Sequence, residues 1–168
     1  MLYGPGCESD KNMNDEHKAR LEGIHNFRLL DERSGTAGQP ADGQFSDIGE
    51  AGFEVVINLA MPDSDNASAE EGRLVAEQGM SYVHIPVDFE SPRVTDYELF
   101  RSVMEGCRDR SVFVHCAANK RVSVFLYLFR TGLGAPHEEA WRDVLTLWTP
   151  DPTWTNFIAE VRDVGSLS

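Results

Sequence analysis

The chain has 168 residues, of which 41% are hydrophobic, which is enough for one globular domain with a sizeable core but not for two. Its formal net charge of -13 argues against a surface for nucleic acid or for anionic membranes, because both select basic faces. No apolar run reaches the length of a membrane span. The three cysteines, an odd number, favour a reducing compartment, so we expect a cytoplasmic protein unless a signal peptide has been removed.

Residues 1–24 are polar and show no hydrophobic period, so we expect a flexible leader followed by a single domain over residues 25–168. From there, short β-rich runs alternate with segments of helical period. This alternation predicts an α/β fold with a mostly parallel central sheet flanked by helices. The expected elements are a strand at 27–30, a helix at 42–52 capped by Asp42, a strand at 54–59, a helix through 74–75 that ends at 79, a strand at 82–87, a helix from a capping box at Thr95 and Glu98 to 108, a strand at 111–115, a core helix at 122–132, and helices at 136–148 and 153–164.

The junction between the strand at 111–115 and the core helix carries the residues with the clearest chemistry. Cys116 ends the strand, and a small polar turn leads to the helix. The backbone amides of such a turn, together with the positive end of the helix dipole, form a pocket for an oxyanion. The pattern therefore predicts an anion-binding loop with a cysteine at its first position.

In that pocket Cys116 is the expected nucleophile, because the amides, the dipole and Arg121 favour the thiolate over the thiol. The forked guanidinium of Arg121 can grip two phosphate oxygens at once. Ser123 is a candidate to assist the thiolate when it leaves in a second step. The expected phosphate-binding residues are Ala117, Ala118, Asn119, Lys120, Arg121 and Val122.

The segment resembles the signature loop of the protein tyrosine and dual-specificity phosphatases, His-Cys-x5-Arg-Ser/Thr, with its buried helix and Tyr-Leu pair, here Tyr127-Leu128. The resemblance implies the fold of these cysteine phosphatases and a phosphocysteine intermediate. It also implies that His115 tunes the thiolate.

The spacing departs from that family pattern. Four residues separate Cys116 from Arg121, and Val122 occupies the position where the arginine is expected. Ser123 keeps the family's spacing from the cysteine, which favours a displaced arginine in a loop of ordinary length over a loop that is one residue short.

A wider pattern is similar, in order and spacing, to a group of phosphatase-like bacterial proteins whose members also occur fused to β-lactamase-like hydrolases. The similarity covers residues 27–148, and several group members carry a Cys-x4-Arg loop. The segments that match are Ser34-Gly35-Thr36-Ala37-Gly38-Gln39-Pro40, Gly52–Leu59 and Tyr82–Val87.

Cleavage of a phosphate ester also needs an acid that protonates the leaving oxygen. Asp88 fits this role, because it lies 28 residues before Cys116 and directly after a predicted strand. In a parallel α/β sheet both loops emerge at the carboxyl ends of strands, where ligands bind. Glu90 and Asp96 are the alternatives, with Asp96 better suited to the start of the following helix.

The expected function is a cysteine-dependent phosphatase acting on a phosphorylated small molecule or protein, with no metal or organic cofactor. Scattered histidines, the lack of Cys-x-x-Cys spacing and the lack of Gly-rich nucleotide loops give no support for a metal or nucleotide site. Two alternatives stay open. A rhodanese-like sulfurtransferase also carries a persulfide on a Cys-x4-Arg loop, and an inactive phosphatase-like domain would bind phosphoproteins without hydrolysis.

Simpler structural roles also stay open for individual residues. Cys116 could be a buried core cysteine, since free cysteines are often buried. Asp88 could be one of many surface acids, and Asn119 and Lys120 could serve only to form the turn.

Overall fold

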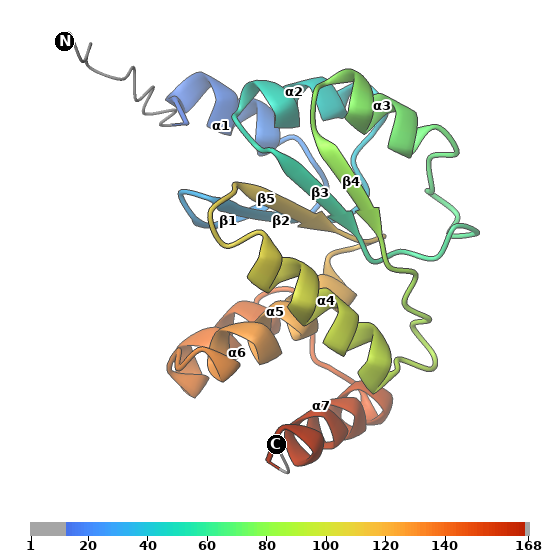
Figure 1. Ribbon diagram of the computed structural model, residues 1–168, viewed down its shortest axis with the longest axis vertical. Coiled ribbons are helices and arrows are strands. Elements are labelled where there is room, and N and C mark those ends of the chain that lie inside the picture. Colours follow the sequence, from blue (N-terminus) through green and yellow to red (C-terminus); the bar gives the residue numbers. More distant parts are fainter. Residues whose placement is uncertain (1–12, 167–168) are drawn as a thin grey trace, which may run out of the picture.

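The structure is a computed structural model that describes residues 13–166 (Figure 1). None of the helices in this range is long and apolar enough to cross a membrane. In chain order the elements are α1 (Asp15–Leu21), β1 (Arg28–Asp31), β2 (Ser34–Ala37), α2 (Gln44–Glu50), β3 (Val55–Asn58), α3 (Glu71–Glu77), β4 (Ser81–His84), α4 (Val94–Gly106), β5 (Val112–His115), α5 (Lys120–Gly132), α6 (His137–Leu145) and α7 (Pro152–Ser166).

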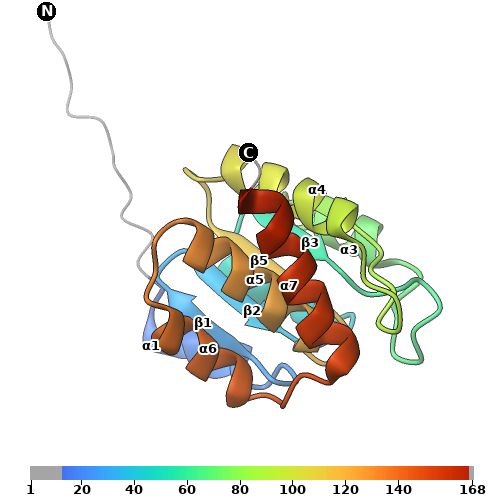
Figure 2. The same ribbon diagram turned by 90° about the horizontal axis from the view of Figure 1, so that it is seen from below.

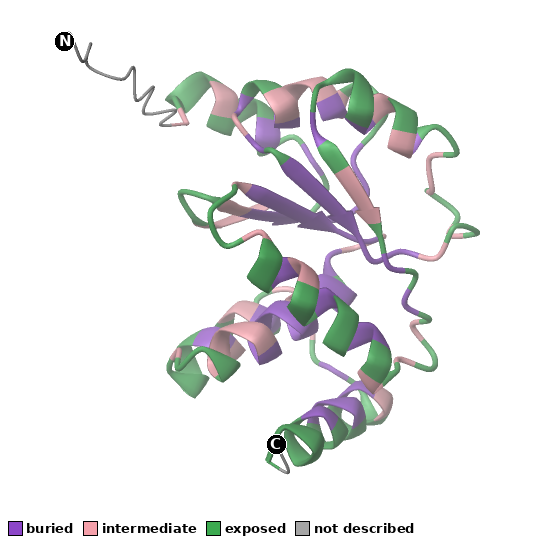
Figure 3. Cartoon of the chain, in the orientation of Figure 1, coloured by how far each residue is buried: buried purple, intermediate pink, exposed green. Residues whose placement is uncertain are grey.

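The strands form one five-stranded sheet in the order β1-β2-β5-β3-β4. β1 pairs with β2 in antiparallel fashion, whereas β2, β5, β3 and β4 run parallel. All four residues of β3 and all four of β5 are buried, which explains their continuous apolar sequences (Figure 3). The strand that leads to Cys116 therefore lies at the centre of the sheet.

Helices cover both faces of the sheet. α1, α2 and α3 lie on one face, and α4, α5, α6 and α7 lie on the other, where Figure 2 shows them from below. Each face has its own hydrophobic cluster: Phe45 and Ile48 contribute to the first, and Phe100, Phe125 and Trp154 to the larger second one. The fold class predicted from the sequence is confirmed.

The amino-terminal segment differs from the expected leader in its described part. Residues 15–21 form α1, which begins at an Asn14 cap, and Leu21 and Ile24 are buried in the first cluster. Arg20 fixes the helix to α2 by contacting Glu50 at 2.6 Å. Only one side chain of α1 is buried, so its sequence shows no apolar stripe; residues 1–12 lie outside the described part of the chain.

Two predicted helix caps are wrong. α2 begins one residue later than expected, with Gly43 at its N-cap and no side-chain cap, so Asp42 does not cap the helix; Gln44 Oε1 instead accepts from the Ala41 amide at 2.8 Å. α4 begins before the predicted capping box, at Val94, because Arg93 pairs with Asp96 across its first turn at 2.8 Å. The strand β2 was not predicted, since its sequence Ser-Gly-Thr-Ala lacks an apolar alternation.

Candidate functional site

Cys116 follows β5 at the carboxyl edge of the sheet. Its amide donates to Ala37 O at 3.3 Å, while the carbonyl of His115 accepts from the Leu59 amide at 2.8 Å. These bonds extend the contacts of β5 with β2 and β3 by one residue on each side. Only 1% of the Cys116 surface is exposed, so the thiol lies at the base of the loop rather than at its rim.

α5 starts four residues after Cys116, and Asn119 at its N-cap has the left-handed φ of 66° that asparagine tolerates. The Asn119 side chain does not cap the helix. Its Nδ2 instead donates to Asn26 O at 2.8 Å and to Thr36 Oγ1 at 3.1 Å. The first-turn amides of this 13-residue helix therefore have no side-chain cap, which suits an anion at the positive end of the dipole.

The carbonyl groups of the loop are held from outside. Ala117 O accepts from Asn66 Nδ2 and from the Gln39 amide, each at 3.1 Å, and Ala118 O accepts from Asn26 Nδ2 at 3.1 Å. In a planar trans peptide the N–H points opposite to the C=O. The amides of Ala118 and Asn119 therefore point away from these side chains, as an amide cradle requires.

Gly38 explains why the predicted motif at 34–40 contains a glycine beside the loop. A Cβ at this position would lie 2.7 Å from His25 Cδ2 and 2.9 Å from Ala117 O. The Gly38 amide also donates to His25 O at 2.7 Å. Only glycine lets this segment approach the Cys116 loop so closely.

Arg121 lies in the first turn of α5 with only 6% of its surface exposed. Its Nη1 donates to Val87 O at 2.9 Å, and its guanidinium carbon lies 5.8 Å from the centre of the Phe89 ring. Its buried Nε has no hydrogen-bond partner among the described residues. One edge of the guanidinium is thus anchored to protein, while the edge that carries Nε can still bind an acceptor.

The hydrogen bond from Arg121 to Val87 O lies beside the predicted acid, Asp88. Asp88 directly follows Val87 and is exposed, and its Oδ1 accepts from the Glu90 amide at 2.9 Å in a tight turn. Arg121 therefore links the Asp88 segment to the Cys116 loop. Asp96 is 7% exposed and paired with Arg93 at the start of α4, which is the structural role that its sequence position suggested.

Glu71 is a site residue that the sequence did not reveal. Its side chain is buried with that of His115, and His115 Nε2 is hydrogen-bonded to Glu71 Oε1. The other carboxylate oxygen accepts from Gln39 Nε2 at 2.8 Å. Because an ionised carboxylate only accepts hydrogen bonds, we assign the proton of His115 to Nε2. Nothing near Glu71 in the sequence marks it among 28 acidic residues.

Ser123 and Lys120 face the connection between α6 and α7. Ser123 Oγ donates to Lys120 O at 2.6 Å and accepts from Trp148 Nε1 at 3.1 Å. Lys120 Nζ lies 5.4 Å from the centre of the Trp148 ring. Val122 is fully buried in the larger cluster, so Arg121 is the side chain that turns toward the loop at 87–89.

No protein-family model and no curated protein matches the sequence. Among solved structures, the chain is similar to a protein of Shewanella putrefaciens CN-32 described as "putative phosphatase (DUF442)". The two share 35% sequence identity with a TM-score of 0.77, over 85% of this chain and 95% of the other.

More distant structures share the fold. Tk-PTP in its active form is 17% identical over 82% of this chain and 97% of its own, with a TM-score of 0.69. The core catalytic domain of the PP-IP phosphatase SIW14 from S. cerevisiae is 13% identical over 85% of this chain and 92% of its own, also with a TM-score of 0.69.

Proposed function

The chain belongs to the DUF442 group of the protein tyrosine and dual-specificity phosphatase-like family, and on that premise we propose that it hydrolyses phosphate monoesters through a phosphocysteine on Cys116. Family membership supports a phosphatase-like hydrolase. The proposal adds the nucleophile, the acid and the residues that hold the phosphate.

The state of Arg121 is the observation that carries the proposal. A buried guanidinium with an unpartnered Nε is costly unless a ligand completes its hydrogen bonds. Nε and one terminal nitrogen lie on the same edge of a guanidinium and fit two oxygens of a phosphate. Because Val87 O holds Nη1, this edge is already oriented before a substrate arrives.

The reaction would proceed in two displacements. The Cys116 thiolate attacks phosphorus, a P–S bond forms, the P–O bond to the leaving group breaks, and Asp88 gives its proton to the departing oxygen. Asp88, now a carboxylate, then takes a proton from water, the water oxygen attacks phosphorus, and the thiolate leaves. Arg121 and the loop amides hold the phosphate oxygens in both steps.

Glu71 and Gln39 would act as positioning residues. They fix the His115 ring through Nε2, and the ring's other nitrogen lies 3.4 Å from Cys116 O. The two residues thereby fix the orientation of the side chain that precedes Cys116 in the chain. Neither residue is expected to touch the substrate.

The test is hydrolysis of p-nitrophenyl phosphate by the full chain under reducing conditions. We expect Cys116→Ser to abolish turnover and Asp88→Ala to reduce kcat about 100-fold, the usual contribution of a general acid. Cys107→Ser and Glu90→Ala are the matched controls. Cys107 is the other described thiol, and Glu90 lies in the same turn as Asp88, so both variants should keep the native rate.

Other outcomes would select the alternatives. Phosphate binding that persists in Cys116→Ser, with no hydrolysis by the native chain, would indicate a binding module. Turnover of thiosulfate and cyanide that depends on Cys116 would indicate a sulfurtransferase. Loss of activity in Glu90→Ala but not in Asp88→Ala would move the acid to the neighbouring carboxylate.

A further inference from the structure

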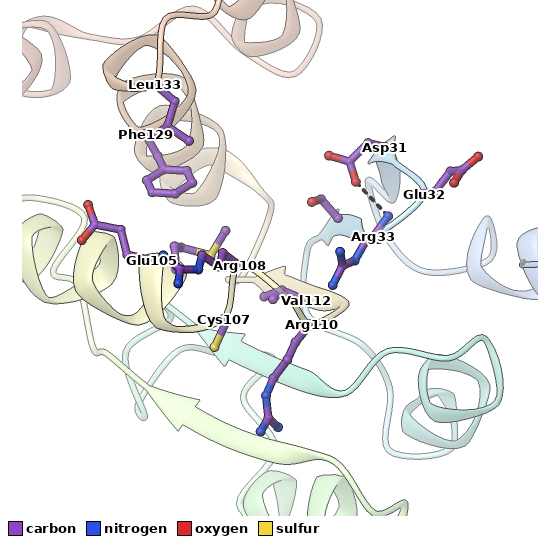
Figure 4. Close-up of a pocket in the computed structure, with 12 residues that line it drawn as sticks. Asp31, Glu32, Arg33, Glu105, Cys107, Arg108, Arg110, Val112, Phe129 and Leu133 are labelled. Carbon is purple, nitrogen blue, oxygen red and sulfur yellow. Dashed lines mark hydrogen bonds between the residues drawn. The ribbon is translucent and has the colours of Figure 1, made fainter. Parts of the chain in front are cut away.

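A pocket of about 790 Å³ lies at the amino-terminal end of β5, whereas Cys116 follows the carboxyl end of that strand (Figure 4). It is enclosed by the β1–β2 hairpin, the end of α4, the end of α5 and the start of β5, and we call it the hairpin pocket. Val112 lines it at the first position of β5, so four residues of strand, about 13 Å, separate it from Cys116. Its volume lies in the range of pockets that bind organic ligands.

The hairpin pocket has an apolar lining. Met104 and Val112 are buried, whereas Leu133 is 71% exposed, more than the exposed Leu99 at 52% or Leu145 at 48%. Figure 4 shows Phe129 on α5 and Leu133 directly after that helix, across the space from the hairpin residues Asp31, Glu32 and Arg33. An apolar body placed here would remove exposed hydrophobic surface from water.

Basic side chains stand on two sides of this lining, although the chain has only 15 lysines and arginines against 28 acids. Figure 4 places Arg33 on the hairpin side and Arg108 at the end of α4, while Arg110 extends away from Phe129. Arg33 takes part in no ion pair in the described part of the chain. The ion pair of Arg108, to its neighbour Asp109, is 3.8 Å long and highly exposed.

Two of the three carboxylates that share the lining have partners, whereas Glu32 has none among the described residues. Asp31 Oδ1 accepts from the Arg33 amide at 2.8 Å, inside the hairpin turn. Glu105 Oε1 lies 3.6 Å from Arg101 Nε on α4. The pocket lining holds three acids and three arginines. Because Asp31 and Glu105 have these partners, the guanidinium groups of Arg33 and Arg108 are available to an added anion.

We propose that the hairpin pocket binds an organic anion that carries one carboxylate, sulfonate or phosphate group on an apolar body. The apolar body packs against Phe129 and Leu133, and the anionic group lies between Arg33 and Arg108. This site is separate from the Cys116 loop and needs neither its thiol nor Arg121.

The test is calorimetric titration of the full chain with two probes, decanoate and 8-anilinonaphthalene-1-sulfonate, which distinguish an acyl from an aromatic ligand. The double variant Arg33→Gln with Arg108→Gln should weaken binding of the accepted probe about tenfold, because it removes both guanidinium groups. Leu133→Gln should weaken it about threefold. Arg33, Arg108 and Leu133 are exposed, so these variants should fold normally.

Two controls localise the binding. Arg73→Gln removes a single positive charge on α3, at the other face of the sheet, and should leave affinity unchanged. Cys116→Ser should bind as the native chain does. Saturable binding of either probe with this pattern supports the proposal and selects the ligand class.

The proposal fails if neither probe saturates below about 1 mM, a limit that corresponds to roughly 4 kcal/mol of binding. It also fails if the arginine variants bind unchanged, or if Cys116→Ser abolishes binding. Sedimentation that shows a dimer which Leu133→Gln dissociates would overturn it as well, because the pocket face would then belong to a second copy of the chain.

Discussion

The loops that follow β5 and β4 meet at one edge of the sheet, but different forces hold them. Directional hydrogen bonds from Asn26, Asn66 and Gln39 fix the Cys116 loop on the side of the smaller cluster. At the Asp88 loop aromatic packing is added to a hydrogen bond from Trp154 Nε1 to Phe89 O at 3.0 Å, and the Phe89 ring lies 5.6 Å from Trp148 and 5.5 Å from Trp154.

This difference matches what each loop is proposed to do. Hydrogen bonds fix position and orientation together, because both their length and their angle are restricted. Ring contacts are each worth about 1 kcal/mol and tolerate small displacements. Directional bonds thus hold the loop of the proposed nucleophile, while ring contacts leave the proposed acid room to adjust to the leaving group. Arg121 joins the two loops through Val87 O.

Among these variants we expect Glu71→Ala to lower the free energy of unfolding most, because it removes the buried carboxylate that bonds both His115 and Gln39. His115 and Gln39 would each lose a buried partner, so we expect the free energy of unfolding to fall by about 3 kcal/mol. Urea titration followed by tryptophan fluorescence measures this loss.

Two further variants test whether the loss of stability is specific to the Glu71 carboxylate. Glu70→Ala, one residue earlier and exposed, should leave the urea midpoint nearly unchanged. Glu71→Gln keeps the size of the side chain and should recover part of the stability. A Glu71→Ala protein as stable as the native one would remove the contrast between the two loops.

Phe89→Ala tests whether aromatic packing positions Asp88. It should reduce kcat for p-nitrophenyl phosphate about tenfold through the loosened Asp88 turn, because small misplacements of a catalytic group are costly. The stability loss should be smaller than for Glu71→Ala, since Phe89 is only half-buried.

Phe129→Ala provides the matched control, as another half-buried phenylalanine but at the far end of α5. It should lose similar stability and keep the native kcat. Equal kcat values in the two variants would show that the ring stack does not position the acid.

The sequence predicted the parts of the fold with strong apolar patterns. β5 is mostly apolar and α5 carries a long apolar run from Val122 to Phe129, so both were located. β2 was missed because small residues build it, and Gly35 must be small: a Cβ there would lie 2.8 Å from the Phe53 ring. α1 was missed because it is held to α2 partly by ion pairs, which leave no hydrophobic period.

The candidate site was predictable where its chemistry follows chain order. Cys116 and Asp88 follow strands, Arg121 lies in the first turn of the helix after β5, and the topology brings them to one edge of the sheet. Glu71 was not predictable, because its contact with His115 spans 44 residues and depends on how α3 packs. The roles of all four residues remain predictions for the variants above.

Tyr82 and Tyr97 pack in the clusters on opposite faces of the sheet, and their variants should give the smallest changes in stability. Burial raises the pKa of each phenol from 10.0 to about 12. Between these values the unfolded chain loses the phenolic proton while the folded chain keeps it, so stability should fall as pH rises from 10 to about 12. Either Tyr→Phe variant should make this alkaline loss shallower.

At pH 7 the two variants should differ, because only one phenol has a polar partner. Tyr82 OH accepts from Asn58 Nδ2 at 3.0 Å, so Tyr82→Phe leaves that amide without a partner and should cost about 1 kcal/mol. Tyr97 packs against Phe125 at 5.7 Å, and Tyr97→Phe should be nearly neutral. Urea midpoints at pH 7 and pH 11 measure both effects. Equal losses at pH 7 would mean that the hydrogen bond between Asn58 and Tyr82 adds no stability beyond that of ring packing.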